Sequence, residues 1–422
     1  MFHDNKEMIQ HECDRLNAVR GVMGGGVDHT TFFHRIRGDL LISGYIASDP
    51  RLLNDLLAEY LYRNDMPTIL LSCHTEPFEH LRRLRSTDSD RSHILIFDPA
   101  EPIYHPFYEM DNQKLLSFLH RAAESLGYHT AIDHILQYAS AALNIIATAY
   151  PVSLPALADL LLYDDDYIAD YALAQGLNDM VSDVILANHE AGIHLRRICE
   201  KLQSAFSAVA DPNADTHYSI QSAARQGTAL QAFYTVSPEQ SLMDEYLKEE
   251  LLCALRQVNR VRVIADELEF SGSDDALLRF LFSMKRQGRV ELIFLSRNAQ
   301  ESADGMPMNF SNVVLSGHDQ PAATEALSKS LWGTYPHSYP VPVAGKPPAL
   351  LFTLRRSTSW QISTQERLRV RAADLFSRQG FLGRTPDLLA VKTTANNSIF
   401  LVSSAQFLSS SSRTSALTRR PA

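Results

Sequence analysis

Short apolar segments alternate with amphipathic segments in the first hundred residues, and this alternation limits the possible folds more than any other feature. Leu40–Ser43, Thr68–Ser72 and His93–Phe97 have the length and apolar content of buried strands. Residues 50–63 and 76–84, which lie between them, have the periodicity of amphipathic helices. Strands that are joined through helices run parallel, and helices cover both faces of a parallel sheet. The sequence therefore predicts an α/β fold with a mostly parallel sheet.

The strand signal stops for a long stretch and then returns. From about residue 110 to 250 the segments have helical periodicity, including 219–235, which we expect to be a helix. Val261–Asp266, Val290–Leu295 and Asn312–Ser316 again have the pattern of strands. We therefore expect an α/β core made of residues 31–109 and 256–335, interrupted by an all-α insertion domain at 110–255.

The two ends of the chain have less regular sequences. Residues 1–30 lack a clear period, and we expect a loose lead-in there. Residues 336–408 predict a small C-terminal α+β module: a strand at 349–354, a helix at 364–378, then a hairpin around Asn396-Asn397 that resembles a winged module. The serine-rich, basic residues 409–422 are typical of a disordered tail.

Composition excludes several classes of protein. The formal charge of −10 excludes a general binder of polyanions, so any contact with nucleic acid must come from local basic patches. The four cysteines lie far apart, which indicates a reducing compartment and no structural zinc. The N-terminus is polar and acidic rather than typical of a signal peptide, so we expect a cytoplasmic protein.

The turn after the first strand has the position of a phosphate-binding loop. In the pattern GxxxxGK[ST], backbone N–H groups hold the phosphates, the lysine reaches the terminal phosphates and the hydroxyl binds Mg²⁺. Here Gly44 is the first glycine and Ser48 follows within the loop, but Asp49, Pro50 and Arg51 occupy the last three positions. Asp and Pro are common where helices begin, so an ordinary strand–turn–helix is the alternative interpretation.

Polar side chains also follow two of the later strands. The strand Val261–Asp266 ends in Asp266-Glu267, a carboxylate pair of the kind that can hold Mg²⁺ through water and polarise an attacking water. The next strand ends in Ser296-Arg297. In doubly wound sheets such strand ends face the ligand crevice, so we expect Gly44, Asp266 and Arg297 to line one site.

The order and spacing of these segments resemble type IV coupling proteins of the TraD/TraG kind, a branch of the FtsK/HerA P-loop ATPases. The resemblance covers roughly residues 38–335, and it includes His105-Pro106-Phe107, which matches the family's segment before its helical domain. It implies a RecA-like core with ATP and Mg²⁺ as ligands. It also implies Asp266 and Glu267 as the catalytic carboxylates, with Asp266 on the metal, and Gly44, Ser48, Asp49, Arg51 and Arg297 around the nucleotide.

The departures from the family argue against efficient hydrolysis. The lysine and the hydroxyl of the loop are absent, and Arg297 stands where the family has glutamine. We therefore expect a degenerate coupling-protein homologue, a subunit of DNA transfer or type IV secretion that binds nucleotide weakly and does not hydrolyse it. Its expected partners are sister subunits, as a homo-oligomer or together with an active ATPase, and the secretion machinery, which would hold it at the inner membrane.

Three points remain open at the level of sequence. An active DNA-translocating ATPase that uses Arg51 in place of lysine is one alternative. A regulatory or defence module that borrowed a motor fold is another. DNA binding has weak support, because the basic run Arg82-Arg83 and Arg85 contains no interleaved aromatic residues.

Overall fold

The computed structural model describes residues 5–24, 28–87, 93–211, 218–268, 276–297, 310–344, 358–379, 383–386, 388–393 and 396–409. The chain forms two compact units, residues 1–52 with 296–422 and residues 53–295. We call them the split unit and the central unit. Each contributes five strands to a mostly parallel α/β architecture, as the strand pattern predicted.

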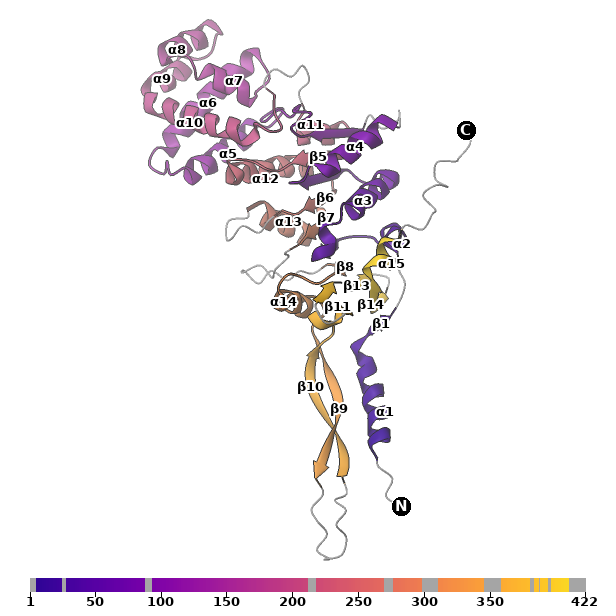
Figure 1. The fold of residues 1–422 in the computed structure, drawn as a ribbon. Coiled ribbons are helices and arrows are strands. Elements are labelled where there is room, and N and C mark those ends of the chain that lie inside the picture. The colour runs from indigo at the N-terminus through magenta and orange to yellow at the C-terminus, as the bar shows by residue number, and fades with distance from the viewer. Residues whose placement is uncertain are drawn as a thin grey trace, which may run out of the picture. The chain divides into compact units, whose positions relative to one another are not determined.

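The central unit contains a parallel sheet in the order β7-β6-β3-β5-β4. Its strands are buried because they lie between two layers of helices; Figure 1 shows α3 and α4 on one side and α12 and α13 on the other. The strands are β3 (Thr68–Ser72), β4 (Ile94–Phe97), β5 (Leu230–Tyr234), β6 (Val261–Asp266) and β7 (Val290–Ser296), and the helices are α3 (Pro50–Arg63), α4 (Glu76–Thr87), α12 (Gln240–Gln257) and α13 (Ala276–Arg286).

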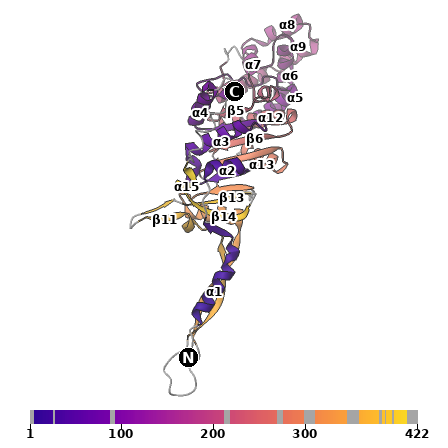
Figure 2. The same cartoon turned by 90° about the vertical axis from the view of Figure 1, so that its right-hand side faces the viewer.

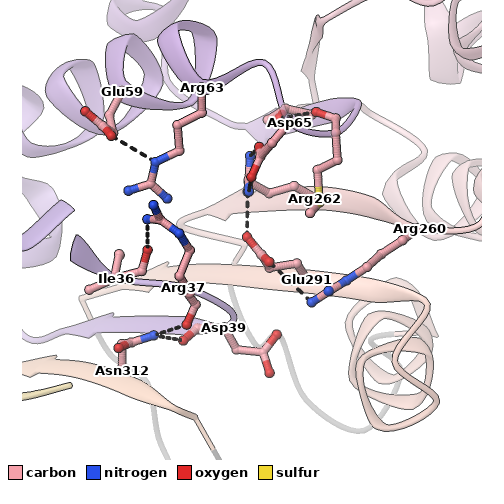
Figure 3. Close-up of polar contacts among 12 residues, drawn as sticks. Ile36, Arg37, Asp39, Glu59, Arg63, Asp65, Arg260, Arg262, Glu291 and Asn312 are labelled. Carbon is pink, nitrogen blue, oxygen red and sulfur yellow. Dashed lines mark hydrogen bonds and ion pairs between the residues drawn. The ribbon is translucent and has the colours of Figure 1, made fainter. Parts of the chain in front are cut away.

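A buried arginine near the amino end of β6, Arg262, forms ion pairs with two neighbouring elements. The Arg262 side chain is 1% exposed, and its guanidinium meets Glu291 at 2.7 Å and Asp65 at 3.0 Å (Figure 3). It also lies 3.8 Å from the ring centroid of Tyr60 on α3. Because a buried cation is tolerated only when it is paired, these contacts fix β6, β7 and the end of α3 together.

A helical block follows β4, as predicted. It comprises α5 (Asn112–Ser125), α6 (Ile132–Ala149), α7 (Leu154–Leu160), α8 (Asp165–Ala174), α9 (Asp179–Ala187) and α10 (His189–Phe206). The side chains of Asp111, Ser153, Asp164 and Asn178 accept backbone N–H bonds at helix starts. Among the described residues no single helix meets the length and apolarity of a membrane span; α6 and α7 meet them only together, across a 109° bend.

The expected helix at 219–235 was wrong. A short helix, α11 (Ile220–Arg225), ends after two turns, and Leu230–Tyr234 forms strand β5, which pairs with β3 and β4. The range predicted to be all helical, 110–255, therefore contains a strand of the sheet. The helical periodicity of this segment was outweighed by the two neighbouring strands, which satisfy its backbone on both sides.

The split unit contains a mixed sheet in the order β1-β14-β13-β8-β2. Strands β2 and β8 are parallel, whereas β13 pairs antiparallel with both β8 and β14. The predicted hairpin is therefore confirmed as β13–β14, but it extends this sheet instead of belonging to a separate winged module. The elements are β1 (Val22–Gly24), β2 (Leu40–Ser43), β8 (Asn312–Leu315), β13 (Leu388–Thr393), β14 (Asn396–Ser403), α2 (His29–Arg35), α14 (Pro321–Trp332), α15 (Ser404–Leu408) and the small hairpin β11 (Phe376–Gln379) and β12 (Gly383–Pro386).

A long two-stranded ribbon corrects two further predictions. β9 (Thr334–Ala344) and β10 (Thr358–Leu368) pair antiparallel over their whole length, so the helix expected at 364–378 was wrong. The residues before Gly21 are not a loose lead-in, because α1 (Lys6–Asn17) packs along this ribbon (Figure 2). The Asn17 side chain bonds the backbone N and O of Ser338, and Asn5 does the same to Trp360. The strand expected at 349–354 and the tail from 410 lie outside the described residues.

Candidate functional site

The turn between β2 and α3 begins with a glycine that no other residue can replace without strain. Gly44 has φ of +88°, and a Cβ at this position would lie 2.4 Å from the Ser316 Oγ and 2.6 Å from the Gly317 carbonyl oxygen. Residues that follow β8 are therefore packed directly against the turn. The role of Gly44 at a nucleotide stays a prediction; in the structure its close neighbours are Ser316 and the Gly317 backbone.

The backbone N–H groups of this turn already have partners within the protein. A short 3-10 helix, Tyr45–Ser48, continues the turn up to Asp49. Gly44 N–H donates to the Ser296 carbonyl (3.2 Å), Tyr45 N–H to the Gly317 carbonyl (3.1 Å), Ile46 N–H to the Ser316 Oγ (3.1 Å), Ala47 N–H to the Gly44 carbonyl (2.9 Å) and Asp49 N–H to the Ile46 carbonyl (3.2 Å). These are the donors that a phosphate-binding loop directs to its ligand.

Asp49 and Arg51 pair with each other at the start of α3. The Arg51 guanidinium donates to both Asp49 carboxylate oxygens, at 3.1 and 2.7 Å, and the Arg51 backbone N–H donates to Asp49 Oδ1 at 2.9 Å. Burial would raise the pKa of Asp49, but the hydrogen bonds from Arg51 outweigh it and leave the pKa below its ordinary value. A carboxylate that stays ionised thus occupies the start of this helix.

Arg297 lies beside the turn, and its role at a nucleotide stays a prediction. Its guanidinium is 5.4 Å from the ring centroid of Tyr45 and 3.7 Å from the Asp319 carboxylate. Asp319 in turn accepts a hydrogen bond from the Tyr45 hydroxyl, which raises the pKa of that phenol. The arginine side chain is 48% exposed, so this cluster forms the outer surface of the turn.

A buried, neutral histidine, His318, contacts the end of β2 just before the turn. The His318 ring bonds the Ser43 hydroxyl through Nε2 and the Thr324 hydroxyl through Nδ1, both at 2.9 Å. Burial lowers the pKa of His318 to about 4, because no charged partner compensates for its desolvation in full. The imidazole therefore holds β2 to the start of α14 without contributing a positive charge at neutral pH.

In the central unit, Asp266 ends β6 beside the last residue of β3. The Ser72 hydroxyl donates to Asp266 Oδ2 at 2.6 Å, and the carboxylate is almost fully buried. Burial raises the pKa of Asp266 to about 6, although the Ser72 hydrogen bond opposes this shift. The side chain is therefore present as a mixture of acid and carboxylate just below neutral pH.

Glu267 takes an unusual backbone conformation and a histidine partner. Its φ is +49°, the left-handed region that glycine adopts with least strain. One carboxylate oxygen lies 3.0 Å from His74 Nε2, and the His74 pKa is raised: burial lowers it, but the acidic neighbours Glu267 and Asp266 outweigh burial. The glutamate is thus already engaged by an imidazole.

The sequence missed several residues that shape these two clusters, namely Ser72, His74, Tyr45, Ser316, His318 and Asp319. All but Tyr45 lie at the end of the buried strands β3 and β8 or within four residues after it, just as Asp266 ends β6 and Arg297 follows β7. The rule that strand ends carry the functional side chains, applied to every strand, would have found these residues. It would not have found Tyr45, which acts through its hydroxyl within the turn itself.

The basic run on α4 is committed to ion pairs. Arg82 bonds both Asp98 and Glu101, and Arg85 bonds Glu101. These pairs join α4 to the turn after β4. Arg82 and Arg85 therefore present little unpaired positive charge to a polyanion.

Comparison with known proteins identifies the fold. No family model and no curated protein matches the chain. The plasmid coupling protein TrwB in complex with the non-hydrolysable ATP analogue ADPNP matches with a TM-score of 0.52 and 13% identity, over 92% of this chain and 91% of that one. The trigonal TrwB form with sulphate gives 0.49 at 13% identity over 86% and 85%. VirB4 of Thermoanaerobacter pseudethanolicus gives 0.36 at 12% over 67% and 78%.

The first of these likenesses is high enough to establish a shared fold, and the predicted fold class is confirmed. The chain has the RecA-like α/β fold with a helical insertion that the sequence indicated. At 13% identity the likeness extends to the fold alone.

Proposed function

We propose that this protein is a coupling-protein homologue with a degenerate phosphate loop, which acts as a non-hydrolysing subunit in conjugation or type IV secretion. The observation that carries the proposal is the hydrogen bonding of the β2–α3 turn. The N–H groups of Gly44, Tyr45 and Ile46 donate to oxygens of this chain, so binding a phosphate there would first require these bonds to break.

The residues at this turn do not fit Mg²⁺ and a nucleoside triphosphate as a P-loop holds them. Arg51 stands in the place of the hydroxyl that binds the metal, and it is paired with Asp49. The Asp49 carboxylate would repel a phosphate from the helix start. Asp266 as a metal ligand and Glu267 as a catalytic base therefore remain predictions, and we derive no catalytic step from them.

A titration with a fluorescent ATP analogue, with and without Mg²⁺, tests the proposal. We expect no saturable binding below millimolar nucleotide and no phosphate release above the buffer rate. Submicromolar, Mg²⁺-dependent binding that Asp266→Ala abolishes would instead support the active DNA-translocating ATPase. The control is Asp319→Ala, which alters the exposed face of the turn and leaves the Asp266 carboxylate unchanged.

Partners form the second part of the proposal. A fold shared with the coupling protein TrwB supports assembly with sister subunits, with an active secretion ATPase and with the machinery at the inner membrane, from the cytoplasmic side. Co-purification with a membrane-anchored secretion ATPase would support this role. A protein that binds no component of such machinery would favour the regulatory or defence module.

A further inference from the structure

An aromatic groove lies on the helical block of the central unit. Its cavity volume is about 580 Å³, and the lining includes Tyr150, Tyr163, Tyr167 and Tyr171 together with two prolines. Tyr163 and Tyr167 stack with their ring centroids 4.6 Å apart, although they are 55% and 51% exposed. Tyr150 is 68% exposed. Large aromatic side chains left in water over a concave surface are typical of a binding site.

A second hollow of about 570 Å³ continues the groove and shares Tyr108 and Pro151 with it. The Oε1 atom of Gln221 in its lining is buried and has no hydrogen-bond partner among the described residues. Glu109 in the same wall has φ of +59°. The hollow therefore offers a buried acceptor that an N–H group of a ligand can satisfy.

The rim of the groove is acidic. Asp159 lines the first hollow, and Glu109 and Asp111 line the second, where Arg256 is the basic residue of the lining. Glu109 is paired with Arg225. Asp164, Asp166 and Asp170, at the start of α8 and within it, are exposed beside Tyr163 and Tyr167. Grooves lined by aromatic side chains bind extended, proline-containing peptides. The acidic rim of this groove favours a peptide that carries positive charge.

We propose that the groove binds residues 345–357 of a second copy of this chain. This segment, GKPPALLFTLRRS, joins the paired ends of β9 and β10, Ala344 and Thr358. It has two adjacent prolines, several large apolar residues and the cations Lys346, Arg355 and Arg356, with no acidic residue. The cations of the segment match the acidic rim of the groove, and its large apolar residues match the apolar lining. Its two prolines match the tyrosines, which can pack against them.

Such a contact is heterologous, because a groove on one copy receives a segment from the next. Every copy then keeps a groove for one neighbour and a segment for another, so assembly continues until a ring closes or a filament grows. This inference does not depend on nucleotide binding, and it names the surface through which sister subunits would meet.

A mixing experiment with full-length variants tests the proposal. The groove variant is Tyr163→Ala with Tyr167→Ala, and the segment variant is Lys346→Glu with Arg355→Glu and Arg356→Glu. In sedimentation velocity, we expect the wild type to form oligomers that grow with concentration and each variant to associate at least about tenfold more weakly. An equimolar mixture should give heterodimers and nothing larger, because only one intact groove meets one intact segment.

Tyr62→Ala is the matched control, since Tyr62 is 68% exposed and lies outside the groove; it should associate like the wild type. Equal thermal unfolding of all variants, followed by circular dichroism, establishes that they fold. The proposal is overturned if the wild type stays monomeric. Docking of the segment on the groove of its own chain would give this same result and would also contradict the proposal. It is also overturned if either variant associates like the wild type, or if the mixture gives no heterodimer.

Discussion

The turn after β2 and the strand ends of β3 and β6 both carry residues that the resemblance assigns to a nucleotide or its metal ion, yet these residues are held in different ways. The turn has Asp49, Pro50 and Arg51 at the positions where the phosphate-loop pattern has glycine, lysine and a hydroxyl residue, and its N–H groups bond to the protein itself. The strand ends keep both carboxylates, but Asp266 is buried against Ser72 and Glu267 is held by His74. In the first region the backbone donors are thus used by the fold, whereas in the second the acidic side chains are held by polar neighbours.

The largest expected effect is at Gly44, where the turn is packed most tightly. Gly44→Ala should lower the free energy of unfolding by about 3 kcal/mol or more, because it combines a positive φ with contacts below 3 Å to Ser316 and Gly317. Gly38→Ala is the control: its φ is +80°, but its nearest atom is 4.0 Å away, so backbone strain alone should cost about 1 kcal/mol. Urea denaturation measures both, and equal losses would show that the packed turn is not special.

The two regions should also respond oppositely to pH. The folded pKa of Asp266 is raised to about 6, so the folded state binds more protons than the unfolded state between about pH 4 and 6. Stability therefore falls as pH rises through this window. Asp266→Asn should remove this slope and raise stability at pH 7 by on the order of 2 kcal/mol.

The folded pKa of Asp49 is lowered, so its contribution has the opposite sign. It is present above the ordinary carboxyl pKa and is lost as pH falls through the folded value. Asp49→Asn should lower stability at pH 7 by about 1 kcal/mol through the weakened pair with Arg51. Urea titrations from pH 3.5 to 7.5 follow both variants, and slopes of the same sign would contradict this comparison.

A smaller effect is expected at Glu267. Because its φ is +49°, Glu267→Gly should be more stable than Glu267→Ala by about 1 kcal/mol. Both variants lose the contact to His74, a partly exposed pair that contributes little, so their difference isolates the backbone strain. Thermal unfolding of the two variants gives this difference. No advantage for glycine would mean that the residue is not strained.

The elements of the fold differ in how well the sequence predicted them. Local patterns sufficed for β2, α3, β3, β6 and β7, because apolar strands and amphipathic helices have distinct periods. Residues 230–234 and 364–368 were wrongly expected to be helical, since both lie in strands whose backbone is satisfied by partners distant in sequence. The sequence shows directly that Pro50 stands where the phosphate-loop pattern has lysine. It does not show that residues 296, 316 and 317 accept the N–H bonds of the turn, because these bonds depend on long-range packing that no local motif encodes.

The smallest expected effect tests whether side chains or backbone separate this turn from a working phosphate loop. The triple variant Asp49→Gly, Pro50→Lys, Arg51→Thr restores the residues of the consensus at positions 49–51. Ser316 and Gly317 still accept the N–H bonds of Ile46 and Tyr45 in this variant, so the donors stay occupied. We therefore expect ATP binding to remain in the millimolar range, measured with the same fluorescent analogue. If the variant binds ATP at micromolar concentration with Mg²⁺, the side chains alone were lost, and the hydrogen bonds of the turn are a consequence of the empty site rather than its cause.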